Sequence, residues 1–227
     1  MMQKILVYNC MEFPEKVRLF NDGIEKEVKT VGIEANFVVP LCPEVLDNVD
    51  EYSHLIISGS EASAMDESDW TSELTDLIHK FVAADKKILG ICYGHQFLAR
   101  VLAGKNCLYK MPVAEYGYSK VNLLENVLFK NISNPICLQL HHDAVRNPGD
   151  DFEIIAENET AVQGFQYNGK AVFGLQFHPE FDHEAAKYFF DVAAEHDPEF
   201  YGYFKNEVSD YSILEQNRLF IQNFLRL

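Results

Sequence analysis

The stretch KILGICYGHQFLARVLAG, residues 87–104, decides the fold. A short apolar run ends at Gly90-Ile91-Cys92-Tyr93-Gly94, and an amphipathic helical pattern follows at once. A strand that turns sharply into a helix forces the residue at the bend into strained backbone geometry, which neighbours without side chains allow. The pattern Gly-x-Cys-x-Gly therefore predicts a nucleophile elbow that exposes the Cys92 sulfur at the carboxyl edge of a parallel sheet.

The predicted position of Cys92 has two chemical consequences. A thiol at a helix N-terminus is favoured as thiolate by the helix dipole. The backbone N–H of Tyr93 faces any carbonyl that Cys92 attacks, and it supplies half of an oxyanion hole. The alternative interpretation is a buried structural cysteine, and the five-residue pattern alone leaves it open.

A second segment supplies what a thiol nucleophile needs. AVFGLQFHPE, residues 171–180, alternates like a strand and ends in His178-Pro179-Glu180. Residues two apart on an extended segment face the same way, so Glu180 can orient the imidazole of His178. We predict His178 as the base for Cys92, although a histidine at a strand end is on its own more often a surface residue.

Strand and helix patterns alternate over the first half of the chain. Continuous apolar strands separated by helices predict a parallel sheet with helices on both faces. The strand patterns cover residues 4–9, 35–41, 54–58 and 87–91, and the helical patterns cover residues 14–31 and the segment from a cap at Asp69 to Phe81.

The pattern changes after residue 105, where short strand-like runs are separated by turn signals. They are VNLL, ICLQL, FEIIA, VQGFQY and AVFGLQF. Asn168-Gly169 predicts a tight hairpin turn, because both positions accept a positive φ. We expect an antiparallel extension of the same sheet, and helices over residues 183–196 and 211–226. The predicted class is α/β, with residues 1–227 forming one domain.

Composition narrows the class of function. The chain has 227 residues and a formal charge of −16, with 19 basic and 35 acidic side chains, so neither nucleic acid nor an anionic membrane is expected as a partner. The five cysteines are widely spaced, and neither a metal site nor a disulfide framework is expected. No leader or membrane span is recognisable in the sequence, which favours a cytoplasmic location.

GICYGHQ together with QFHPE resembles the signature of the class I glutamine amidotransferases, triad enzymes that release ammonia from glutamine. The chain is most similar to the amidotransferase domain of GMP synthase and its free-standing relatives. The resemblance runs from about His54 to Glu180 and implies a flavodoxin-like fold and no cofactor. It implies that Cys92 is the nucleophile, His178 the base and Glu180 its orienter.

The same resemblance suggests roles for further residues. The loop IISGS implies an oxyanion hole made by Gly59, Ser60 and the Tyr93 N–H. Substrate contacts are implied for the residues that match the family's other segments, which are Gln96, Tyr116 in Glu115-Tyr116-Gly117, and His141 and Asp143 in His141-His142-Asp143. The implied reaction passes through a γ-glutamyl thioester on Cys92 to glutamate and ammonia.

The chain departs from the family pattern at four positions around the expected glutamine pocket. The loop that usually reads Gly-Gly-Pro is here Gly59-Ser60-Glu61, and serine resists a positive φ. Leu140 stands where serine is common, and His142 where glycine is common. These departures concern the substrate more than the triad.

Three functions remain open from the sequence. The first is a glutaminase that hands ammonia to a synthetase on another chain, since no phosphate-binding loop is present. The second is a γ-glutamyl peptidase or hydrolase with the same triad and a different leaving group. The third is a non-catalytic binding protein that kept the fold, because a fold alone does not establish activity.

Overall fold

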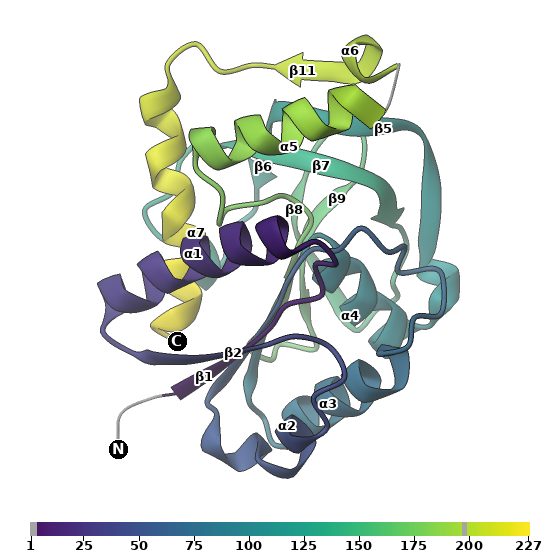
Figure 1. Cartoon of the computed structure of the whole chain (residues 1–227), viewed down its shortest axis with the longest axis vertical. Coiled ribbons are helices and arrows are strands. Elements are labelled where there is room, and N and C mark those ends of the chain that lie inside the picture. Colours follow the sequence, from purple (N-terminus) through teal and green to yellow (C-terminus); the bar gives the residue numbers. More distant parts are fainter. Residues whose placement is uncertain (1–3, 197–198) are drawn as a thin grey trace.

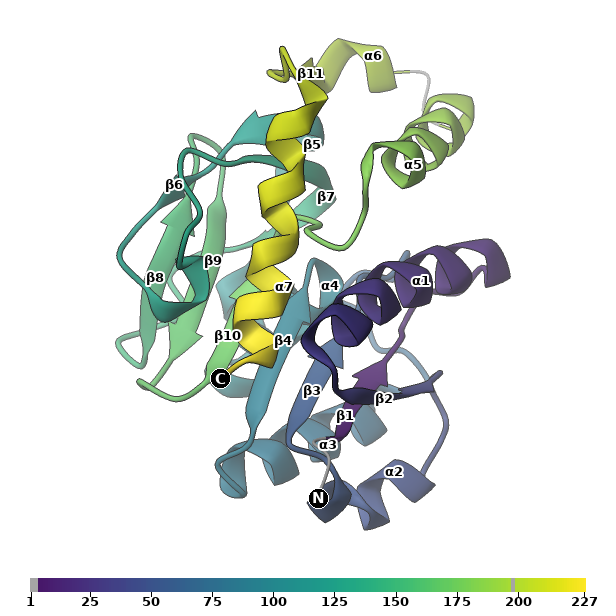
Figure 2. The same cartoon turned by 90° about the vertical axis from the view of Figure 1, so that its left-hand side faces the viewer.

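The computed structural model describes residues 4–196 and 199–227, and it is built on an eight-stranded sheet (Figures 1 and 2). Five strands in the order β2-β1-β3-β4-β10 are parallel, and β9, β8 and β6 continue the sheet in antiparallel fashion. Their bounds are β1 Lys4–Tyr8, β2 Glu34–Val38, β3 His54–Ile57, β4 Lys87–Ile91, β6 Asn122–Leu123, β8 Phe152–Glu157, β9 Val162–Tyr167 and β10 Val172–Leu175. The predicted fold class is confirmed.

Helices cover both faces of the parallel strands, because their residues alternate between two apolar cores. In β1, Ile5 and Val7 pack on one face and Leu6 and Tyr8 on the other. Helix α1 (Pro14–Val31) and helix α7 (Arg218–Leu225) bury their apolar residues in the first core. Helix α3 (Thr71–Ala83) and helix α4 (Tyr93–Ala103) do so in the second.

A separate sheet of three strands corrects the expectation of one continuous sheet. Strand β5 (Leu108–Lys120) lies between β7 (Ile136–Val145) and β11 (Phe204–Asn206). The run ICLQL therefore belongs to this second sheet. Strand β10 lies beside β4 and pairs with it in parallel fashion, whereas its pairing with β9 is antiparallel. The run AVFGLQF therefore extends the parallel part of the large sheet.

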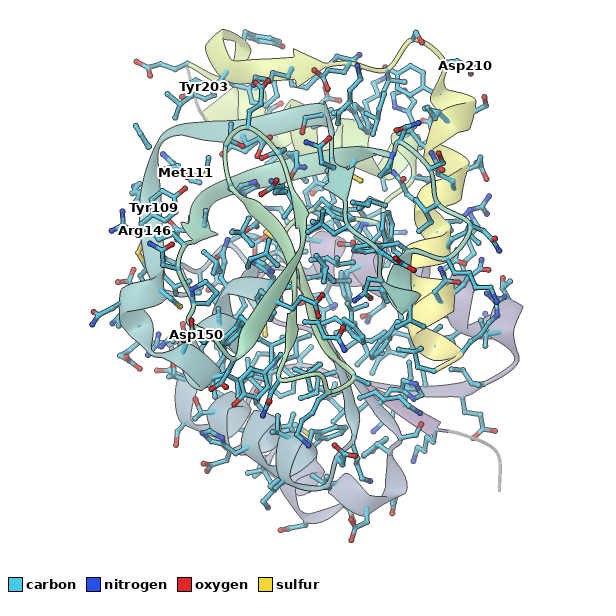
Figure 3. All side chains as sticks on the ribbon, turned by 180° about the vertical axis from the view of Figure 1, so that it is seen from behind. Tyr109, Met111, Arg146, Asp150, Tyr203 and Asp210 are labelled. Atoms are coloured by element: carbon cyan, nitrogen blue, oxygen red, sulfur yellow. The ribbon has the colours of Figure 1, made fainter. Side chains whose placement is uncertain are left out.

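The second sheet curves across the back of the molecule, as Figure 3 shows. Where β5 begins and β7 ends, Tyr109 and Arg146 lie together, with the Arg146 guanidinium 4.9 Å from the centroid of the Tyr109 ring. Strand β5 was not predicted from the sequence, because Pro112 and Gly117 interrupt the alternation of apolar and polar residues along it. Its register with β7 also shifts between Lys110 and Glu115, so the ladder of the two strands is irregular there.

The remaining local predictions are mixed. Helix α5 (His183–His196) and the hairpin turn are confirmed, with Asn168 and Gly169 at φ 48° and 64°. The last helix begins only at Arg218, after a 3₁₀ turn at Tyr211–Asn217. The predicted cap at Asp69 is wrong, because α3 starts after Trp70 and without a side-chain cap.

The short elements α2 (Glu44–Asp47) and α6 (Phe200–Tyr203) complete the described helices. Within residues 4–196 and 199–227, the structure holds no helix with both the length and the apolar composition that a membrane span requires.

Candidate active site

Cys92 occupies a strained bend between β4 and α4, with φ 52° and ψ −103°. Its N–H donates to the carbonyl of Leu175 on β10 at 2.8 Å, which fixes the bend against the neighbouring strand. A Cβ on Gly90 would lie 2.4 Å from the Gly94 carbonyl, and one on Gly94 would lie 2.5 Å from the carbonyl oxygen of Ile57. Both glycines are therefore needed so that helix α4 can turn back closely over the sheet.

His178 and Glu180 lie just beyond the end of β10 and beside Cys92. The Nδ1 atom of His178 is 2.7 Å from Oε1 of Glu180, and both side chains are buried. The ring also interacts electrostatically with the Cys92 side chain, which raises the pKa of His178. The segment 178–180 is a turn rather than a strand, yet it brings the two side chains together.

The surroundings of His178 favour its protonated form. Burial lowers the pKa of the ring, but the negative charges of Glu180 and Cys92 and their hydrogen bonds outweigh burial and raise that pKa to about 10. The ring of Phe181 stacks on the imidazole with 5.3 Å between centroids and so restricts its orientation. An imidazolium held between a carboxylate and a thiol is suited to hold and return a proton.

The loop after β3 passes directly beside this group. A Cβ on Gly59 would lie 3.1 Å from Cε1 of His178 and 3.7 Å from Cβ of Cys92, so any side chain there would crowd the pair. Ser60 is not among the residues with a positive φ, and the family glycine it replaces is therefore not required for backbone reasons. Its hydroxyl accepts a hydrogen bond from the N–H of Ala62 at 3.1 Å.

Glu61 brings a negative charge into the loop expected to receive the oxyanion. Its carboxylate, however, points away from Cys92. One oxygen pairs with Lys16 Nζ of α1 at 2.7 Å, and the other accepts from the Glu12 N–H at 2.9 Å. The ion pair with Lys16 neutralises the charge that Glu61 brings to the loop.

Cys92 opens into a cavity of about 810 Å³ between the two sheets and helices α1 and α5. Gly59 and Glu180 lie behind its wall, each against His178. The wall includes all the other residues predicted from the sequence, namely Ser60, Cys92, Tyr93, Gln96, Tyr116, His141, Asp143 and His178.

One end of the cavity is polar. The Gln96 amide donates to the backbone carbonyl of Asp143 at 2.8 Å and to Oε1 of Gln176 at 3.1 Å. The Asp143 carboxylate accepts from the Ser63 hydroxyl at 2.5 Å. Such fixed donors and acceptors suit the charged amino-acid end of a small substrate. Ser63 was missed by the sequence analysis because its partner lies 80 residues further along the chain.

The two adjacent histidines of β7 face opposite sides, as expected for a strand. His142 is exposed, whereas His141 is buried, with Nε2 3.0 Å from Glu115 and Nδ1 3.1 Å from the Asp143 carbonyl. Tyr116, beside Glu115, packs against Phe200 of α6 with 5.4 Å between ring centroids and 43° between the ring planes.

Another part of the cavity wall carries apolar side chains beside the Lys16 ammonium, and it comes from segments that the sequence analysis did not connect with the site. Phe13 lies at the start of α1, and Tyr188, Phe189 and Val192 come from α5. Helical periodicity predicts that such residues are buried, but it does not indicate which neighbour they face.

The described part of the chain contains no set of three His, Cys, Asp or Glu side chains arranged to hold a metal ion. The ionisable groups gathered at the sulfur of Cys92 are the imidazole of His178 and, behind it, the carboxylate of Glu180.

Comparisons with known proteins identify the family of the chain. Residues 19–195 match the family Glutamine amidotransferase class-I. A glutamine-hydrolyzing GMP synthase subunit from Sulfolobus acidocaldarius is 33% identical over 167 residues, which span 72% of this chain and 85% of the relative.

Two crystal structures share the fold. A glutamine amidotransferase from Thermotoga maritima superposes with a TM-score of 0.77 at 19% identity over all of this chain and 97% of its own. One from Methylobacillus flagellatus gives 0.78 at 19% identity, over all of this chain and 94% of its own. With a family match over most of its length, the chain belongs to the class I glutamine amidotransferases.

Proposed function

We propose that the protein hydrolyses the side-chain amide of glutamine to glutamate and ammonia, with Cys92, His178 and Glu180 as its catalytic triad. The observation that carries the proposal is the buried His178, held by Glu180 at 2.7 Å and electrostatically coupled to Cys92 at the strained bend. The match to the amidotransferase family supports glutamine as the substrate.

The proposed reaction has two halves. The Cys92 sulfur attacks the γ-carbonyl carbon, and the oxygen becomes an oxyanion that the Tyr93 N–H and the Gly59-Ser60 loop receive. As the C–N bond breaks, His178 gives its proton to the leaving ammonia and a γ-glutamyl thioester remains. His178 then takes a proton from water, the hydroxide attacks the thioester, and glutamate leaves as the thiolate reforms.

Glutamine is proposed to lie with its α-amino and α-carboxylate groups at the polar end, near Gln96, Asp143 and Tyr116. The charged groups of an amino acid require polar partners when they leave water, and this end of the cavity offers them. The ammonia is proposed to pass to a separate synthetase chain, since several similar proteins bear the name of a GMP synthase subunit.

A second candidate, hydrolysis of larger γ-glutamyl amides, is favoured by the apolar part of the cavity wall. Ammonia needs no apolar surface, whereas an aryl or alkyl amine would be stabilised against Phe13 and Phe189. The two candidates share the acyl half of the reaction and differ only in the leaving group.

One experiment separates the candidates. Glutamate release is measured for glutamine and for γ-glutamyl anilide, with ammonia quantified in parallel and Cys92→Ala as the control. A higher kcat/KM for glutamine supports the glutaminase, and a higher value for the anilide supports the γ-glutamyl hydrolase. No release from either substrate, with a Cys92 that also resists a glutamine-shaped electrophile, would favour a non-catalytic protein.

A further inference from the structure

A second buried histidine–glutamate pair lies on the wall of the same cavity. Glu115 of β5 and His141 of β7 stand directly opposite each other across the strands, and their side chains meet at 3.0 Å. A shift in register between Lys110 and Glu115 creates this pairing, because the register seen at Lys110 and Asp143 would place Pro112 opposite His141.

The carboxylate of Glu115 is surrounded by donors from four different segments. Burial on its own raises the pKa of this group, but hydrogen bonds and the charge of His141 outweigh burial, so the pKa of Glu115 lies below its usual value. Besides His141, the donors are Ser119, Asn158, Thr160 and Gln163, at distances from 2.6 to 3.2 Å. A carboxylate with five donors is ionised and firmly fixed.

Both nitrogens of His141 face groups that accept hydrogen bonds. Nδ1 meets the carbonyl oxygen of Asp143, which can only accept, and Nε2 meets the ionised Glu115. Both ring nitrogens are therefore engaged by the protein, and the ring is held between the two strands. With both nitrogens engaged, His141 has no donor left for a substrate.

The His141 ring holds a segment that contacts the other pair. The Asp143 carbonyl accepts from His141 and from Gln96. On the same strand, the Leu140 carbonyl lies 3.8 Å from the Cys92 sulfur, and the Leu138 carbonyl accepts from the His178 N–H at 3.0 Å.

We propose that Glu115 and His141 are positioning residues, which fix residues 140–143 and with them the binding end of the cavity for the glutamyl group. This role is distinct from direct contact with substrate, and it rests on the proposed function of Cys92. The contact from Nδ1 of His141 to the Asp143 carbonyl holds the segment, and Glu115 keeps the ring oriented.

The test compares three variants with the wild-type protein. His141→Ala removes the donor, His141→Asn places an amide N–H near the position of Nδ1, and Glu115→Gln keeps the ring but removes the charge. Each is assayed for kcat and KM with glutamine. Cys92 labelling is measured with a glutamine-shaped chloromethyl ketone and with iodoacetamide, which needs no glutamyl group to react.

For His141→Ala we expect KM to rise by about tenfold to a hundredfold, the range that loss of a buried hydrogen-bond partner implies. Ketone labelling should slow by the same factor, while kcat and iodoacetamide labelling change by less than about threefold, because the triad retains its own contacts. His141→Asn should recover most of the loss, and Glu115→Gln should lie between His141→Ala and the wild type.

His54→Ala is the matched control for loss of a buried histidine. His54 of β3 is fully buried against Phe224 of α7 and is not part of the cavity wall. It should lower the unfolding midpoint without changing KM. Denaturant unfolding of all variants shows whether each one folds.

A KM for His141→Ala within threefold of wild type would overturn the proposal, as would equal losses with both labels or no recovery in His141→Asn. If wild type releases no glutamate and neither reagent labels Cys92, the proposed function itself fails, and this inference with it.

Discussion

The two buried histidine–glutamate pairs on one cavity differ in what surrounds them. Among the described residues the Glu180 carboxylate has one hydrogen-bond partner, the ring of His178, and its other oxygen has none. Glu115 accepts from five donors, and both nitrogens of His141 are held by protein acceptors. One ring keeps a nitrogen for Cys92, and the other keeps none.

The difference teaches how the same two residue types support different roles. An under-satisfied carboxylate concentrates its charge on one imidazole, which raises the affinity of that ring for a proton. A fully satisfied carboxylate fixes geometry instead. The first pair is suited to chemistry, and the second pair is suited to holding a strand in place.

The largest expected effect comes from removing the sulfur that only the first pair faces. Cys92→Ala should lower glutamine turnover on the order of 10⁴-fold or more, since covalent catalysis is lost, while the fold stays intact. The check is glutamate release together with thermal unfolding of both proteins. Turnover near the wild-type rate would remove Cys92 from the mechanism.

Replacing the histidine of each pair by alanine gives the next comparison of the two pairs. His178→Ala should lower kcat by about 10³-fold because the proton carrier is lost. His141→Ala should act mainly on KM. Steady-state kinetics of both variants provides the comparison, and a drop in kcat of similar size for both would make the two pairs functionally alike.

Replacing each glutamate by glutamine compares the two pairs again, and the expected effects are smaller. Glu180→Gln should lower kcat by about 10²-fold, less than His178→Ala, because the ring remains but loses its charged partner. Glu115→Gln should leave kcat close to wild type and raise KM. An unchanged kcat in Glu180→Gln would contradict the orienting role of Glu180.

A crowding substitution tests the first pair without removing any of its groups. Gly59→Ala places a methyl group about 3.1 Å from the His178 ring and should lower kcat by about tenfold, as a displaced catalytic group does. Gly202→Ala is the control, because an added Cβ there meets nothing within 4 Å. Equal activity of the two variants would show that the ring tolerates displacement.

The smallest expected effect concerns stability against pH. The pKa of His178 is raised from 6.5 to about 10 in the folded protein. Its protonation therefore contributes stability that is fully present below pH 6.5 and is lost as pH rises towards about 10. Denaturant unfolding across this range should show a steeper loss for wild type than for Glu180→Gln. Parallel curves would mean that Glu180 does not set the pKa.

The first pair could be predicted from the sequence and the second could not, for a geometric reason. His178 and Glu180 are two residues apart, so local geometry alone brings them together. Glu115 and His141 lie 26 residues apart and meet because of the register shift in β5, a strand whose alternation Pro112 and Gly117 interrupt.

The same reasoning explains the outcome for the fold. The parallel strands and the elbow followed from apolar runs and from the glycines around Cys92. The second sheet did not, since the run ICLQL carries no signal of which sheet it joins. The apolar part of the cavity wall depends on how α5 packs against α1, which helical periodicity alone does not specify.

The most direct test of the account is mass spectrometry of the protein quenched in acid during glutamine turnover. The account predicts a γ-glutamyl adduct on the peptide that contains Cys92, and on no other cysteine. The adduct should be absent in Cys92→Ala and slower to form in Glu180→Gln. Glutamate release without any adduct on Cys92, or with the adduct on another cysteine, would contradict it.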